Sequence, residues 1–128
     1  ISASGISTMG SSYLVNDNFI ATLTYGDGSI ASLTYAANGP KTGLPKERIE
    51  VFSDGKGYVL DDFVSLTEFP SGKQLWSSRE NDKGHSAEFL DFGNAISSGS
   101  SEGPIALEQL LETTAVALHI EDLLQGRV

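Results

Sequence analysis

The stretch NFIATLTYGDGSIASLTY, residues 18–35, sets the predicted architecture. Two runs rich in β-branched and aromatic residues flank Gly26-Asp27-Gly28, where glycine permits the positive φ of a tight hairpin. Side chains of a strand alternate between its two faces. One face is largely apolar and carries Phe19, Ala21, Leu23, Tyr25, Ala31, Leu33 and Tyr35. The other mixes hydroxyl and aliphatic side chains: Ile20, Thr22, Thr24, Ile30, Ser32 and Thr34.

That second face is less polar than a fully solvated sheet face. A contiguous surface of this kind is typical of a region that another subunit covers. We therefore expect the chain to self-associate through the exposed face of its sheet, and a two-fold dimer is the commonest arrangement.

Two further hairpins follow along the chain. The runs 48–53 and 58–63 flank Asp54-Gly55-Lys56-Gly57, and the runs 64–69 and 73–78 flank Pro70-Ser71-Gly72. Both connections contain the glycine that tight turns favour.

After residue 80 the apolar spacing becomes helical. A first helix is predicted from Asp82, a plausible N-cap, to a stop at Gly99, and a second within 105–125 that ends at Gly126. Strands followed by helices predict an α+β fold: an open, largely antiparallel sheet of hairpins with the helices packed on one face. Residues 1–128 are expected to form a single domain.

Composition excludes several classes of function. The formal net charge of −9 argues against nucleic-acid binding and against docking on anionic lipid. The chain has no cysteine, which excludes disulfides, cysteine-ligated zinc and thiol catalysis. No apolar run approaches the roughly 20 residues of a membrane helix, and the first twelve residues lack signal-peptide features. These points favour a cytoplasmic protein.

Basic residues gather in the loop 38–48, which holds three of the eight in the chain. Lysine donors suit sugar hydroxyls, carboxylates and phosphates. We expect Lys41 and Lys46 to be substrate contacts, with Asn38 as a further candidate, whereas Arg48 begins a strand and is expected to be structural. A solvated connector is the alternative reading of this loop.

Other polar residues give weaker signals. His85 is either a surface residue or a substrate contact, and His119, inside the second helix, is expected to be partly buried. Asp61 and Asp62 are adjacent on a predicted strand, so they point to opposite faces and do not form a metal pair. We expect no metal site and no catalytic residue in this chain.

The order of four segments resembles the C-terminal domain of the Gfo/Idh/MocA oxidoreductases, which include glucose–fructose oxidoreductase and inositol dehydrogenase. The segments are DNFIATLTYGDGSIASLTYAANG, LPKERIEVFSDGKGYVLDDF, DKGHSAEFLDFGNAI and PIALEQLLETTAVALHIEDLLQG. The similarity runs from about Asn16 to Val128. The pieces PKERIEVF, LDDF and DKGH are most similar to a subgroup with some members fused to a zinc-type alcohol dehydrogenase-like region.

The resemblance implies an NAD(P)-dependent sugar or cyclitol dehydrogenase. In that family a Rossmann domain binds NAD or NADP and carries the catalytic lysine, while the C-terminal domain forms subunit contacts and helps close the substrate site. This chain shows no Gly-x-Gly-x-x-Gly and opens at Ile1 with strand-like sequence. We therefore expect a C-terminal fragment without its Rossmann domain, inactive alone and binding no cofactor. The segment LPKER aligns with a substrate-facing loop, but Pro45 replaces the aromatic residue of that loop.

Two functions from different classes remain open at this point. The first is the substrate-side and oligomerisation domain of such a dehydrogenase, which acts on a small sugar-like substrate. The second is a free-standing binding or scaffold domain with no enzymatic parent.

Overall fold

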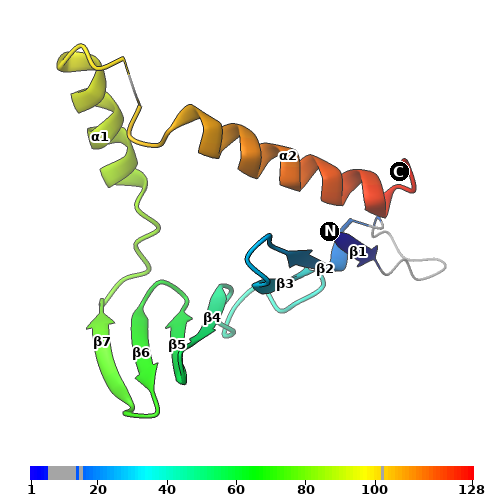
Figure 1. Cartoon of the computed structure of the whole chain (residues 1–128). Helices are drawn as coiled ribbons and strands as arrows, with labels where there is room; N and C mark the ends of the chain where they lie inside the picture. Colours follow the sequence, from blue (N-terminus) through cyan, green and yellow to red (C-terminus); the bar gives the residue numbers. More distant parts are fainter. Residues whose placement is uncertain (6–13, 15, 102) are drawn as a thin grey trace. The chain divides into compact units, whose positions relative to one another are not determined.

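The computed structural model describes residues 1–5, 14, 16–101 and 103–128. The chain divides into two compact units, Ile1–Gly39 with Glu102–Val128 and Pro40–Ser101, which we call unit 1 and unit 2. Each unit combines antiparallel strands with one helix (Figure 1). The predicted α+β fold built from antiparallel hairpins is thereby confirmed.

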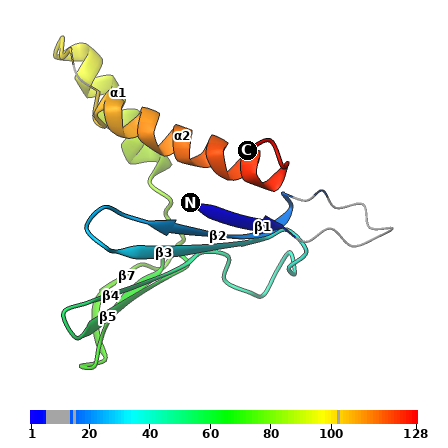
Figure 2. The ribbon, with the colours of Figure 1, turned by 45° about the vertical axis from the view of Figure 1, so that its right-hand side comes forward.

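Unit 1 is a three-stranded sheet with a long helix on one face. Its strands pair in the order β1 (Ser2–Gly5), β2 (Asn18–Thr24) and β3 (Ile30–Ala36). The helix α2 (Leu107–Leu124) lies along this sheet and contacts β1 (Figure 2). The predicted alternation is confirmed, because Ala21 pairs with Ala3 on one side and with Leu33 on the other.

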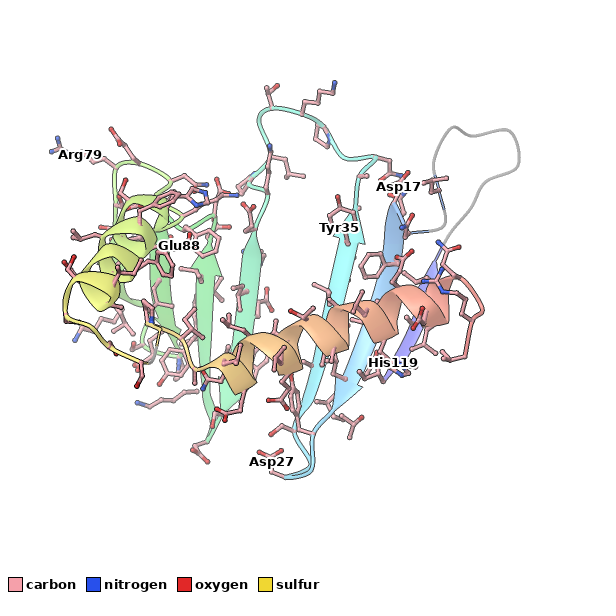
Figure 3. All side chains as sticks on the ribbon, turned by 90° about the horizontal axis from the view of Figure 1, so that it is seen from above. Asp17, Asp27, Tyr35, Arg79, Glu88 and His119 are labelled. Carbon is pink, nitrogen blue, oxygen red and sulfur yellow. The ribbon has the colours of Figure 1, made fainter. Side chains whose placement is uncertain are left out.

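The layer between α2 and the sheet holds the core of unit 1. Among the described residues of the chain, the buried hydrophobic side chains are Ala21, with 0% of its surface exposed, and Ile120, with 7%. Phe19 of β2 and Tyr35 of β3 lie on the same face as Ala21, with ring centroids 5.5 Å apart (Figure 3). This small core leaves much apolar surface in contact with solvent.

Unit 2 is a four-stranded meander followed by a helix. Its strands are β4 (Arg48–Ser53), β5 (Lys56–Asp61), β6 (Ser65–Phe69) and β7 (Lys73–Ser77), and α1 spans His85–Ser97. The turn between β4 and β5 places Asp54 and Gly55 at φ 51° and 74°, as a two-residue hairpin with matching twist requires. All three predicted hairpins are present.

The strands form two sheets, and residues 37–47, which join β3 to β4, contain no strand. Pro40 and Pro45 lack the N–H that a ladder needs, and no apolar alternation runs through the segment. The strand β1, which pairs with β2, agrees with the strand-like sequence that begins at Ile1.

The helix ends agree only in part with the predictions. Gly99 and Gly126 follow α1 and α2 with φ of 66°, and the N–H of Gly126 donates to the carbonyl of Leu123, so both predicted stops are confirmed. The predicted N-cap is wrong: Gly84 occupies that position, and Asp82 accepts the N–H of Gly84 in the preceding turn. His119 is exposed rather than partly buried, so that prediction is also wrong (Figure 3).

The described helices include none that is long and apolar enough to cross a bilayer. Large apolar side chains are nevertheless exposed on both units. In α1 they are Phe89, Leu90, Phe92 and Ile96. An apolar surface of this extent is typical of a protein that binds a partner.

Candidate functional site

The basic loop ends in a clamp on the turn between β5 and β6. The main-chain N–H of Lys46 donates to Asp62 Oδ1 at 3.2 Å, and the N–H of Asp62 donates to the carbonyl of Glu47 at 2.6 Å. These two bonds fix the position of Lys46 through its backbone. The Lys46 side chain is therefore left available for other contacts.

The turn itself has an unusual backbone. Asp62 and Phe63 have φ of 48° and 53°. Aspartate tolerates this left-handed region because its short side chain bonds locally, whereas a bulky residue such as phenylalanine is rare there. The turn directs the Asp62 carboxylate toward the loop, where the Lys46 N–H holds the pKa of Asp62 below its usual value. Bonds to Glu47 and Asn81 lower this pKa further.

A third segment reaches the same place from the entrance of α1. Lys83 forms an ion pair with Glu47 Oε1, two residues before His85. The second carboxylate oxygen of Glu47, Oε2, is buried and has no hydrogen-bond partner. Three segments distant in sequence thus meet in one polar cluster, which we call the clamp cluster: Lys46, Glu47, Asp62, Asn81 and Lys83.

The structure distributes the predicted site residues unevenly. Lys46 belongs to the clamp cluster. His85 lies two residues after Lys83 of this cluster and is the exposed first residue of α1, with its Nδ1 3.9 Å from Glu88 Oε2. Lys41 is exposed in the loop of unit 2. Asn38 belongs to unit 1, where its N–H donates to Asn18 Oδ1 at 3.4 Å.

The basic residues of the loop differ in their partners. Arg48 is bound by acidic neighbours: its Nε lies 2.7 Å from Glu50 Oε1 and its Nη1 4.0 Å from Asp61 Oδ1. Within the described ranges, no ion pair or hydrogen bond engages the side chain of Lys41 or Lys46. These two ammonium groups are therefore the available donors of the loop, and Arg48 contributes to the strand.

Asp61 and Asp62 have separate partners, Arg48 and the Lys46 N–H respectively. No group of three or more histidine or acidic residues in the described part of the chain is placed to hold a metal ion. The clamp cluster supplies hydrogen bonds and charge, with donors from its lysine and asparagine side chains.

Sequence reasoning missed a shallow hollow at the other end of the unit 2 sheet. Phe52 of β4, Gly57 of β5 and Phe69 of β6 lie in one cross-strand row, and Pro70 completes the rim. The Phe52 ring packs over Gly57 and is 77% exposed. The sequence did not show this row, because the predicted hairpin placed Gly57 in its turn, whereas the structure places it in β5 opposite Phe52.

The turns at Gly28 and Gly55 differ in context from the glycine turns of dinucleotide sites. Such sites lie where a parallel strand runs into a helix N-terminus through a glycine-rich turn. Here Gly28 and Gly55 each stand in a turn between two antiparallel strands.

Comparisons with protein-family models, with curated proteins and with solved structures found no match to this chain.

The clamp makes a prediction about acid stability. A carboxyl group with a lowered pKa in the folded state stabilises the fold above its unfolded pKa, and this contribution disappears as the pH falls through the folded pKa. We expect Asp62→Asn, which suits a positive φ, to lower the unfolding free energy by a constant amount above about pH 5, and the difference to vanish at lower pH. Urea titrations of both proteins between about pH 2 and pH 7 measure this. A pH-independent difference would contradict it.

Proposed function

We propose that this chain is the substrate-side and oligomerisation domain of an NAD(P)-dependent sugar or cyclitol dehydrogenase of the cytoplasm. The observation that carries the proposal is an open antiparallel sheet in unit 2 to which the end of the basic loop is fixed, through the bond from the Lys46 N–H to Asp62. The resemblance in segment order supports the same assignment. In this proposal a separate Rossmann domain supplies the hydride chemistry, and this chain supplies substrate contacts and a subunit interface.

The basic loop is suited to bind a polyhydroxylated or anionic substrate. The clamp fixes the main chain at Lys46, so its ammonium group is positioned with a smaller loss of loop entropy on binding. Lys41 adds a second donor from the same loop. His85 follows the Lys83–Glu47 ion pair and offers an imidazole donor or acceptor. None of these residues is assigned a role in proton or hydride transfer.

The face of the unit 1 sheet opposite α2 is suited to a subunit contact. Rows of paired residues cross it, such as Ser2–Thr22–Ser32 and Ser4–Ile20–Thr34. The hydroxyl groups supply hydrogen bonds, and exposed Ile20 and Ile30 supply apolar area. We propose that a second copy covers this surface, which we call the hydroxyl face, through a two-fold axis.

The loop is tested by alanine substitution in the complete enzyme. We expect Lys46→Ala to raise the KM for substrate by about 5- to 150-fold, which corresponds to about 1–3 kcal/mol for a charge-assisted bond. Cofactor affinity should not change. The substitution retains the bond to Asp62, because the main-chain N–H makes it.

A matched control is Lys73→Ala, which removes an equal charge from β7. Steady-state kinetics with varied substrate and then varied cofactor separate the two effects. Unchanged kinetics in both Lys41→Ala and Lys46→Ala would assign the loop to the role of a solvated connector.

A free-standing binding or scaffold domain is the second candidate. The exposed apolar residues of α1 and the Phe52–Phe69 hollow favour it, because both suit a protein partner. The complete reading frame discriminates between the two. An adjoining Rossmann region supports the dehydrogenase, and its absence supports the scaffold.

A further inference from the structure

The face of α2 opposite the sheet carries an ordered apolar stripe. Its members follow one another at intervals of four, three and four residues: Leu107, Leu111, Thr114 and Leu118. At about 100° per residue the centre of the stripe lies roughly 150° around the helix from buried Ile120. Leu107, Leu111 and Leu118 are 68%, 60% and 61% exposed. We call these four residues the outer stripe.

Intervals of three and four residues are those of the contact positions in paired helices. A single helix that packs only on a sheet needs one apolar face, which Ile120 and its neighbours already supply. The outer stripe gives α2 a second apolar face, and this face is not used within unit 1. A surface helix with two opposite apolar faces is expected to pack on two sides.

We propose that the outer stripe is an interface between two copies of this chain, in which their α2 helices pair antiparallel. With the two-fold axis between residues 112 and 113, the stripe is complementary to itself. Leu107 then lies opposite Leu118 of the second copy, and Leu111 lies opposite Thr114. Every member of the stripe thereby meets another member.

The residues beside the stripe favour the same arrangement. In an antiparallel helix pair, equivalent flanks face each other. On one flank Glu108 meets Ala115 of the second copy, and on the other Leu110 meets Ala117. No carboxylate therefore faces another carboxylate directly. The alanine side chains allow the two helices to approach closely.

Charge at the helix end decides the orientation. Glu121 continues the spacing of the stripe and accepts two bonds from Asn16 Nδ2, at 3.1 and 3.3 Å. In a parallel pair the two Glu121 carboxylates would face each other, which is unfavourable. In the antiparallel pair Glu121 lies level with Pro104 of the second copy, just before that helix begins. The helix dipole attracts negative charge at this end.

This interface is independent of the proposed dehydrogenase function and of the hydroxyl face, which lies on the opposite side of the sheet. The absence of cysteine makes it directly testable by disulfide cross-linking of the 128-residue chain. Leu107→Cys and Leu118→Cys proteins are mixed in equal amounts and mildly oxidised. We expect the mixed dimer to form about tenfold faster than a dimer of either variant with itself.

Gln109→Cys provides the background rate, because residue 109 lies on α2 away from the outer stripe and is exposed. Faster linkage of Leu107→Cys to itself would indicate a parallel pair and overturn the proposal. Rates equal to the Gln109→Cys background would also overturn it, and would show that another part of the chain or a different partner covers the stripe.

A second measurement avoids reliance on cysteine chemistry. In a Thr22→Lys background, where a lysine in the central strand disables the hydroxyl face, Leu111→Lys should weaken dimerisation by about 100-fold or more in sedimentation experiments, because the substitution buries a charge in the α2 interface. The fold should persist, since Leu111 is exposed within the unit. Dimerisation of the unmodified chain should strengthen from about 50 to about 500 mM salt, since screening reduces repulsion between acidic chains. A helical CD spectrum with undiminished dimerisation when Leu111→Lys is added to Thr22→Lys would overturn the proposal.

Discussion

Ile120→Ala should lower the free energy of unfolding of unit 1 by about 2–4 kcal/mol. Ile120 is 7% exposed and lies on α2, which contacts β1. The alanine side chain loses apolar contacts that isoleucine makes and leaves a cavity. Because α2 packs along the sheet, it can move only partly into this cavity. Small domains have total stabilities of about 5–15 kcal/mol, so this one substitution removes a large fraction. Urea unfolding followed by the CD signal of the helices measures the change.

His119→Ala is the matched control, since residue 119 is adjacent on the same helix and exposed. We expect its effect to stay within about 0.5 kcal/mol. Equal losses in the two variants would mean that the buried side chain at position 120 contributes no more to stability than the exposed one at position 119. In that case the Ala21–Ile120 layer would not be the core of unit 1.

Local features of the sequence predicted much of the fold. The pairing of Phe19 with Tyr35 follows from the alternation on either side of Gly26-Asp27-Gly28, and the register of β4 and β5 follows from the Asp54-Gly55 turn. These signals work because each hairpin is decided by residues close in sequence. The stops at Gly99 and Gly126 are local in the same way.

Features of the fold that depend on residues far apart in the sequence could not be predicted from it. The division into two sheets could not be predicted, because no pattern in the segment 37–47 indicates whether β3 and β4 pair. The N-cap at Asp82 was wrong because the positive φ of Gly84 starts the helix later than the polar residue suggests. The exposure of His119 depends on which face of α2 meets the sheet, and α2 has apolar residues on two sides.

The candidate site shows the same limit. The basic character of the loop was visible in the sequence, and the availability of Lys41 and Lys46 is consistent with their proposed role. The Glu47–Lys83 ion pair joins residues 36 positions apart, which no spacing rule predicts. The clamp on Asp62 likewise depends on a main-chain bond formed only after β5 and β6 are in place.

Thr22→Lys should weaken association through the hydroxyl face by about 100-fold or more. Thr22 lies in the central strand β2, in the row that it forms with Ser2 and Ser32, so a lysine there would be buried without a partner when two copies meet. An unpaired charge in an interface costs about 2–5 kcal/mol of binding free energy. In a two-fold dimer this cost applies twice, because each copy contributes one substituted residue. Sedimentation velocity from about 1 to 100 μM measures the shift in dissociation constant.

Thr113→Lys is the control, because it adds the same charge on an exposed position of α2 outside the outer stripe. Combining Thr22→Lys with Leu111→Lys then separates the two proposed interfaces. If both interfaces form, each single variant still dimerises through the interface that is left intact, because the two surfaces lie on opposite sides of unit 1. The double variant is then monomeric. If, in a Leu111→Lys background, Thr22→Lys associates as tightly as the Thr113→Lys control, the hydroxyl face is solvated. The scattered isoleucines among its threonines would then be isolated surface residues of a kind that needs no partner.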